Sequence, residues 1–189
     1  MKITFVASHT QKKELMEYYK IIKAILEKSE IKLKYGGLFN ATDDIDKSEA
    51  SRNLWYKKSM NDIKESDIVV VEISYPSTAN VGHCLTYALE IGKPVVALYK
   101  NDRDPLFLRG QKNDKLTIIP YSDSKDLEKI LNSALEYAAE QMDTRFNFFI
   151  SPKIGNYLDW VAKKLKMPRA VYLRKLIEKD MEKNKGYTG

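Results

Sequence analysis

The sequence predicts an α/β fold in which a parallel sheet is covered by helices on both faces. The near-continuous apolar run at 68–73 is typical of a central parallel strand that is buried on both sides. Short apolar runs also alternate along residues 2–142 with longer segments of helical apolar spacing. Such alternation favours β–α units joined by right-handed crossovers. With 43% hydrophobic residues in a chain of 189, a packed core is expected.

The elements expected before the central strand follow in order along the chain. Residues 2–7 are β-branched and aromatic and predict a first strand. Apolar residues at helical spacing predict a helix at 11–29. A short strand at 31–35 ends at two glycines, and the polar, acidic segment 40–48 is expected to be a loop. A helix at 50–64 then leads into the central strand.

The elements expected after the central strand complete the first unit. A helix at 80–91 is stopped by Gly92 and Pro94, and a buried strand follows at 94–99. A polar loop at 101–115 precedes a short strand at 116–120 and a helix at 124–142, with Ser122 or Ser124 as its N-cap. Since ligands bind at the carboxyl ends of parallel strands, residues 7–10 and 74–80 are expected to border the site.

The tail differs from the first unit, so we expect two domains, 1–142 and 143–189. Residues 145–150 alternate in polarity and predict a lone strand. Ser151 and Pro152 begin a first helix, which breaks at Met167 and Pro168 before a second helix. One strand and two helices of this length cannot bury a core unaided. The tail is therefore predicted to pair with a second copy of the chain.

Composition narrows the classes of partner and cofactor. The tail contains eleven Lys and Arg against five Asp and Glu, and so it alone accounts for the net charge of +6, which favours anionic partners. One cysteine excludes an internal disulfide, and two histidines argue against a histidine metal cage, so we expect no metal and no cofactor. With no long apolar run and no signal-peptide pattern, a cytoplasmic protein without a membrane segment is expected.

Four segments carry a resemblance to a known family. These are ITFVASH at 3–9, DIVVVEISYPS at 67–77, VGHCLTYALEIGKPV at 81–95 and LRG at 108–110. Over residues 1–142 the chain resembles the nucleoside 2-deoxyribosyltransferase and deoxynucleotide N-glycosidase family. The resemblance implies a Rossmann-like (flavodoxin-like) fold. It also implies chemistry with two acids: one attacks or stabilises the anomeric carbon of the sugar, and the other assists departure of the base.

The resemblance assigns both acids to positions where this chain has none. Cys84 stands where the family has its attacking glutamate, and Ser59, eight residues before Asp67, stands where it has its second acid. The first domain is therefore predicted to be catalytically degenerate, with Cys84 serving as a small packed residue. If activity remains, the possible stand-ins are Asp62, one helical turn beyond Ser59, and Glu72. The acidic loop offers Asp43, Asp44 and Asp46, for which a solvated surface is the alternative reading.

Ligand binding is expected to survive the loss of the acids, and the resemblance implies a nucleoside or nucleotide ligand. Ser77 matches the family's phosphate-contacting serine, although helix capping is an equally good role for it. Ser8 matches a serine of the family's N-terminal loop, but the usual glycines of that loop are absent. The candidate ligand-binding residues are Ser8, His9, Ser77, Asn80, Gly82 and Arg109.

The tail carries a second resemblance, which is most specific at LKMPRAVYLRKLIEK, residues 165–179. It resembles the ribbon–helix–helix family, in which strands from two chains form a ribbon that reads the major groove of DNA. The resemblance implies that Arg145, Asn147 and Phe149 face the bases and that Arg169 lies near a phosphate. The alternative is that the tail only oligomerises the chain.

Taken together, these features predict a homodimeric or homotetrameric DNA-binding regulator with a degenerate nucleotide-sensing domain. Two alternatives stay open. One is an active N-glycosidase or deoxyribosyltransferase with rearranged acids. The other is an oligomeric ligand-binding protein that does not bind DNA.

Overall fold

The structure is a computed structural model that describes residues 1–28, 31–39, 48–142, 148–184 and 186. The chain divides into two compact units, Met1–Asp143 and Thr144–Gly189, and each is described here by itself. Within the described residues, every helix is too short or too polar to cross a membrane.

The first unit contains the expected parallel sheet, which is confirmed. Its five strands lie in the order β2-β1-β3-β4-β5, and every neighbouring pair is parallel. In this order the chain turns to opposite sides of β1, and such switch points are where open α/β sheets bind ligands. The strands are β1 (Lys2–Val6), β2 (Lys32–Lys34), β3 (Ile68–Glu72), β4 (Val95–Lys100) and β5 (Leu116–Tyr121).

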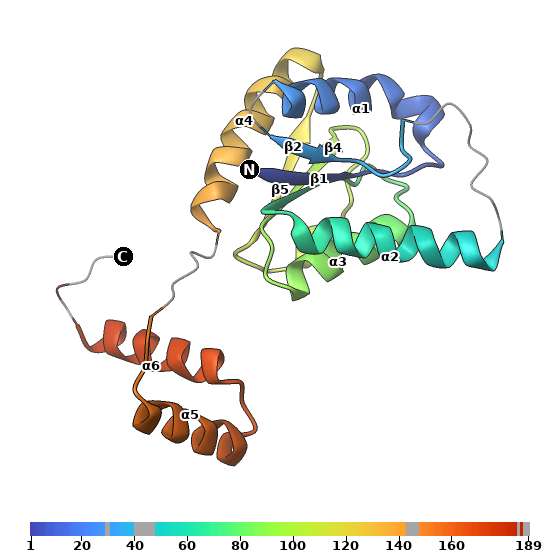
Figure 1. The fold of residues 1–189 in the computed structure, drawn as a ribbon. Helices are drawn as coiled ribbons and strands as arrows, with labels where there is room; N and C mark the ends of the chain where they lie inside the picture. The colour runs from blue at the N-terminus through green and yellow to red at the C-terminus, as the bar shows by residue number, and fades with distance from the viewer. Residues whose placement is uncertain (29–30, 40–47, 143–147, 185, 187–189) are drawn as a thin grey trace. The chain divides into compact units, whose positions relative to one another are not determined.

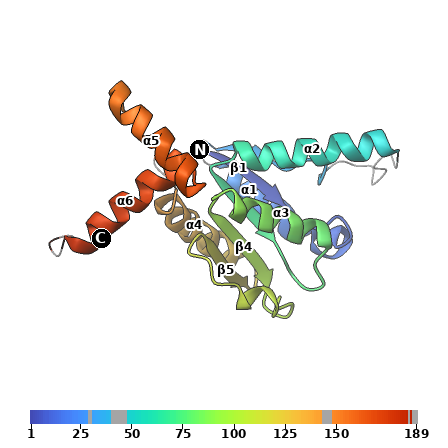
Figure 2. The same cartoon turned by 90° about the horizontal axis from the view of Figure 1, so that it is seen from below.

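Helices cover both faces of the sheet (Figure 1). One face carries α1 (Lys12–Glu27) and α4 (Ser124–Glu140). The other face carries α2 (Glu49–Glu65) and α3 (Ala79–Glu90), which lie beside each other in the turned view of Figure 2 as well. The short helix η1 (Leu108–Gly110) lies in the loop between β4 and β5.

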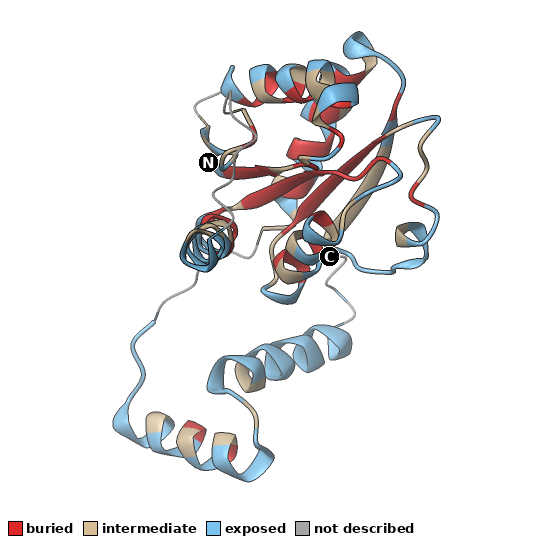
Figure 3. Cartoon of the chain, turned by 90° about the vertical axis from the view of Figure 1, so that its right-hand side faces the viewer, coloured by how far each residue is buried: buried red, intermediate tan, exposed pale blue. Residues whose placement is uncertain are grey.

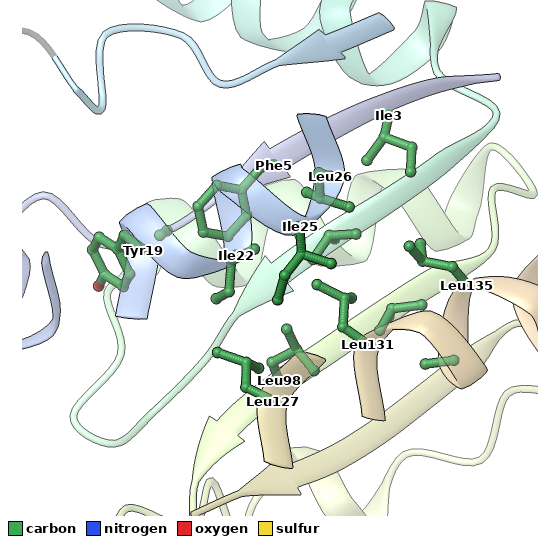
Figure 4. Packing of buried hydrophobic residues seen from close by; sticks show 14 of the residues in the cluster. Ile3, Phe5, Tyr19, Ile22, Ile25, Leu26, Leu98, Leu127, Leu131 and Leu135 are labelled. Carbon is green, nitrogen blue, oxygen red and sulfur yellow. The ribbon is translucent and has the colours of Figure 1, made fainter. Parts of the chain in front are cut away.

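The core follows from the alternation of side chains along the strands. Ile3 and Phe5 of β1 point toward α1 and α4, where they join the leucines and isoleucines of those helices (Figure 4). Thr4 lies between them in sequence and faces α2, where its Oγ1 donates to the backbone oxygen of Asp62 at 3.0 Å. All five residues of β3 are buried, as expected of a central strand that is covered on both faces.

The N-cap of α4 differs from the prediction. The capping residue is Asp123, whose carboxylate accepts hydrogen bonds from the backbone N–H groups of Lys125 and Asp126. The prediction of Ser122 or Ser124 was therefore wrong. A carboxylate at this position satisfies two of the orphan donors of the helix and also complements the positive end of its dipole.

Polar residues mark both edges of the sheet. At one edge, β2 has only three residues, and Lys32 and Lys34 are exposed. At the other edge, β5 carries the exposed Pro120, which has no backbone N–H to donate.

The second unit contains two helices, α5 (Pro152–Leu165) and α6 (Arg169–Lys183). Ser151 caps α5 by accepting from the N–H of Ile154, and Lys166 ends that helix in the left-handed conformation at φ 49°. Among the described residues of this unit, only Leu158 and Val161 are buried, and most of the others are exposed (Figure 3).

The expected strand of the tail is only partly described. Residues 143–147 lie outside the described residues, and 148–150 are in no strand. The ribbon–helix–helix unit is therefore not confirmed.

Candidate functional site

A cavity of about 210 Å³ opens beside the carboxyl end of β1, close to the switch point of the sheet. Four segments line it: β1 with the residues that follow it, residues 35–38 after β2, one face of α2, and the beginning of α3. Three strand–helix units therefore converge on the cavity, and its lining residues come from distant parts of the sequence.

The cavity brings together the two positions to which the resemblance assigns the acids. Ser59 on α2 and Cys84 on α3 are both half-buried, and both line it. The correspondence in sequence is thus also a correspondence in space. Neither side chain is a carboxylic acid, so neither of the two positions to which the resemblance assigns an acid carries one.

Burial affects the chemistry of Cys84, the chain's one cysteine. Desolvation raises the pKa of its thiol above the ordinary value. The thiol is therefore neutral near pH 7, and a neutral thiol is a weak nucleophile. Cys84 thus does not replace the carboxylate that the resemblance assigns to its position.

Both of the chain's histidines line the cavity, and each contacts an aromatic residue of α2. The ring of His9 meets the ring of Trp55 edge-on, with centroids 6.1 Å apart. The ring of His83 stacks on Tyr56 at 5.8 Å, and the Tyr56 hydroxyl lies 3.3 Å from His83 Nε2. Together with Tyr35, these rings give the cavity an aromatic lining.

Asp62 is the one acid that lines the cavity within the described residues. Its side chain is mostly buried, and its Oδ1 accepts a hydrogen bond from Lys34 Nζ at 2.8 Å. Lys34 also lies 3.4 Å from Glu65, and its pKa is raised, mainly by the hydrogen bond to Asp62. Asp62 is thus ion-paired with a lysine of β2. The other acids considered, Asp43, Asp44 and Asp46, lie outside the described residues.

The structure does not bring Glu72 to the cavity. Its side chain is completely buried on the α1 and α4 face of the sheet, where Oε1 accepts from the hydroxyl groups of Ser74 and Tyr121. As a stand-in catalytic acid, Glu72 is therefore misplaced. Its position follows from strand alternation, because Glu72 shares a face with Val70 and not with Val71.

Only some of the predicted ligand-binding residues line the cavity. His9 and Asn80 line the cavity, whereas Ser8, Ser77, Gly82 and Arg109 do not. Ser8 is buried, and its hydroxyl group is hydrogen-bonded to that of Thr10 at 2.7 Å. Ser77 is exposed after the cis Tyr75–Pro76 bond. Arg109 lies on η1 and forms an ion pair with Asp104 at 2.6 Å.

The predicted DNA-contacting residues lie in the tail. Arg145 and Asn147 are outside the described residues. Phe149 is fully exposed. Arg169, the first residue of α6, is ion-paired with Asp159 of α5, so a phosphate would compete with that carboxylate for the guanidinium.

Sequence reasoning missed Trp55, Tyr56 and His83 as site residues. A signal was present, because Trp55 and Tyr56 are adjacent aromatic residues in a helix whose other residues are mostly polar. Such residues are either core or site, and here they line the cavity. The described residues contain no group of three or more His, Cys, Asp or Glu that could hold a metal ion.

Comparison with known proteins supports the fold of the first unit. No protein-family model matches the chain. A protein of Thermofilum pendens with the provisional name 2′-deoxynucleoside 5′-phosphate N-hydrolase 1 is 32% identical over 95 residues, which cover 49% of this chain and 65% of that protein. The chain thus spans less than two thirds of the length of this relative.

Two solved structures share the architecture. A CMP N-glycosidase of Clostridium botulinum superposes with a TM-score of 0.51 at 16% identity, covering 70% of this chain and 99% of that one. A 2-deoxyribosyltransferase of Bacillus psychrosaccharolyticus superposes with a TM-score of 0.50 at 17% identity, covering 68% and 90%. The first unit therefore has a fold like that of the 2-deoxyribosyltransferases and N-glycosidases.

Proposed function

We propose that the first unit binds a nucleoside or a nucleoside monophosphate without cleaving it. The observation that carries this proposal is the convergence of Ser59 and Cys84 on one cavity, because the two positions expected to hold acids meet where the ligand would lie. The aromatic lining supports a planar base as the ligand. The names of the relatives, which mention CMP and 2′-deoxynucleoside 5′-phosphates, indicate the class of ligand to test first.

Loss of cleavage follows from the chemistry that remains. Departure of a base needs a proton donor and a carboxylate to support an oxocarbenium-like sugar. The thiol of Cys84 is neutral, and the hydroxyl of Ser59 is a very weak acid. Among the described residues, the cavity therefore has aromatic surfaces and Asp62 but no acid at either of the two assigned positions.

Ligand binding is expected to depend on Trp55. Replacing Trp55 by Ala should weaken the binding of 2′-deoxynucleoside 5′-monophosphates to the full chain by about tenfold or more, since stacking on an aromatic ring contributes about 1–3 kcal/mol. Isothermal titration calorimetry would measure the dissociation constants. The matched control is Trp160→Ala, which removes the chain's other tryptophan from the second unit.

Cys84 provides an independent readout of occupancy. A bound ligand should slow alkylation of this cysteine by iodoacetamide, because Cys84 lines the cavity. If no nucleoside or monophosphate gives heat or protects Cys84, the binding proposal is wrong.

A second candidate function rests on Asp62. Since this acid lines the cavity one helical turn from Ser59, it could act as the carboxylate of an active N-glycosidase or deoxyribosyltransferase with rearranged acids. Lys34 Nζ binds Oδ1 of this carboxylate. This candidate requires release of free base by the unmodified chain.

We propose that the tail oligomerises the chain through its apolar face. Its helices bury only Leu158 and Val161 within the described residues, which is too small a core for an independent fold. A second copy of the tail would cover further apolar side chains that are exposed in the single chain. These are Phe148, Ile150, Ile154, Leu165, Val171, Leu176, Ile177 and Met181.

We further propose that the assembled tail binds DNA, which would make the chain a ligand-responsive regulator. Its positive charge supports an electrostatic contribution that falls as salt rises. Arg145→Ala is expected to weaken binding of a selected DNA fragment by about tenfold, as for loss of a bidentate base contact of about 1–3 kcal/mol. Gel-shift titration would measure the effect, with Lys183→Ala as a control of equal charge change. Unchanged affinity of the Arg145 variant would refute base reading by this residue.

A further inference from the structure

A buried polar network surrounds Glu72 on the sheet face covered by α1 and α4. The helices that line the cavity, α2 and α3, cover the opposite face. Glu72 and Ser74 are completely buried. Three hydrogen bonds converge on one carboxyl oxygen, Glu72 Oε1, and their donors are the backbone N–H of Ser74 at 3.3 Å, the Ser74 hydroxyl and the Tyr121 hydroxyl at 3.2 Å. These three donors thus meet a single oxygen atom.

The second carboxyl oxygen, Glu72 Oε2, is buried and has no hydrogen-bond partner among the described residues. Gln11 belongs to the same network, and its buried Oε1 also has no partner there. Leaving an ionised carboxylate oxygen buried and unpaired is unfavourable. A proton on Oε2 removes the charge and turns this oxygen from an unpaired acceptor into a donor. The geometry therefore fits a neutral carboxylic acid at Glu72.

The network connects two loops that border the cavity. Gln11 donates from its Nε2 to the backbone oxygen of Ser74 at 3.2 Å, and Tyr19 donates to the backbone oxygen of Ser8 at 3.3 Å. His9 lies between Ser8 and Gln11 and lines the cavity. On the other loop, Ser74 precedes Thr78, which also lines it. Glu72 thus contacts the second loop directly through Ser74, and Ser74 in turn binds Gln11 of the first loop.

We propose that Glu72 is a positioning residue, protonated in the folded protein, which fixes the loops at 8–11 and 74–78, and that its ionisation loosens them. The proposal adds a pH-dependent control to the cavity. Only the consequence for ligand affinity rests on the proposed function. No contact between Glu72 and the ligand is involved.

The groups around Glu72 support this assignment. Tyr19 of α1 and Tyr121 of β5 stay neutral, because burial above all raises the pKa of both phenols far beyond the usual range. The nearby cation is Arg103, which is paired with Glu14 at 2.5 Å. Burial raises the pKa of Glu72, and the hydrogen bonds from Ser74 and Tyr121 and the charge of Arg103 oppose that rise.

The sign of the pH effect follows from the direction of this shift. A raised folded-state pKa means that the folded protein holds the proton more tightly than the unfolded chain does. The stabilisation from Glu72 is complete below the ordinary glutamate pKa of about 4.3 and is lost as the pH rises through the raised value.

The fluorescence of Trp55 reports on the first loop, because the Trp55 ring contacts His9 of that loop. In a Trp160→Phe background, Trp55 is the only tryptophan of the full chain. Its emission would be titrated from pH 5 to 10 without ligand, once with Glu72 and once with Glu72→Gln, a neutral isostere. We expect the Glu72 protein to show a one-proton transition that the Gln variant lacks. Because no ligand is present, the outcome does not depend on the proposed binding function.

Two further variants complete the test. Glu128→Gln on α4 removes an exposed carboxylate that pairs with Lys28, and it should leave the transition unchanged. Ser74→Ala removes a donor to Glu72 Oε1 and should move the transition to higher pH, which gives a second test if Glu72→Gln fails to fold. The proposal would be overturned if the titration curves of the Glu72 protein and the Glu72→Gln variant superimpose, or if the transition is unshifted in Ser74→Ala.

Discussion

A chain that carries Ser59→Asp and Cys84→Glu together is expected to release free base from 2′-deoxynucleoside 5′-monophosphates at least about 100-fold faster than the unmodified chain. Both substitutions place a carboxyl group in the cavity at the two positions where the resemblance calls for acids. Acid and base groups that are placed against a reacting bond contribute about 10²–10⁴-fold in rate. Liquid chromatography of the released base would measure the gain at saturating enzyme.

The control for this experiment is the double variant Ser59→Asn with Cys84→Gln, which has nearly the same shape and no acid. It should remain as inactive as the unmodified chain. Rapid base release by the unmodified chain would instead support the second candidate function. In that case Asp62→Asn should abolish the release, because Asp62 is the remaining cavity acid among the described residues.

The second large effect is expected in the tail. Leu158→Ala should destabilise the second unit by about 2–5 kcal/mol, the usual range for truncating a buried leucine. Because Leu158 is one of only two buried residues among those described in this unit, such a loss should unfold α5 and α6. Hydrogen exchange measured by mass spectrometry would detect it as a loss of protection at 152–183 with the first unit unchanged.

A surface variant separates folding from assembly. Ile177 is 62% exposed in the single chain, so Ile177→Asp has little to disturb within one copy. If a second copy covers this side chain, the variant should dissociate the oligomer. DNA binding should then be lost as well. Analytical ultracentrifugation would measure the change. An oligomer that survives both Leu158→Ala and Ile177→Asp would show that assembly does not use the tail.

Much of the first unit was predictable because its signals are local. The apolar run of β3, the stop at Gly92 and Pro94, and the helical spacing of α1 each depend on a few neighbouring residues. Cap choice was less predictable, because Ser122, Asp123 and Ser124 are all good capping residues and only the path of the backbone selects one.

The site was predictable only in part, because it is assembled by tertiary structure. The motif matches located Ser59 and Cys84, but the pairing of His9 with Trp55 and of His83 with Tyr56 depends on how α2 packs beside β1 and α3. Glu72 was misassigned for a related reason. An acid within a strand motif points to one face or the other, and only the register of β3 in the sheet decides which.

The edges of the sheet bear on how copies of this chain would come together. An unpaired edge strand is a template for intermolecular β-pairing, and lysines, short length and proline are the usual safeguards against it. Here β2 combines the first two and Pro120 supplies the third. Concentrated protein should therefore resist fibril formation through the sheet, and thioflavin T fluorescence during prolonged incubation should stay flat.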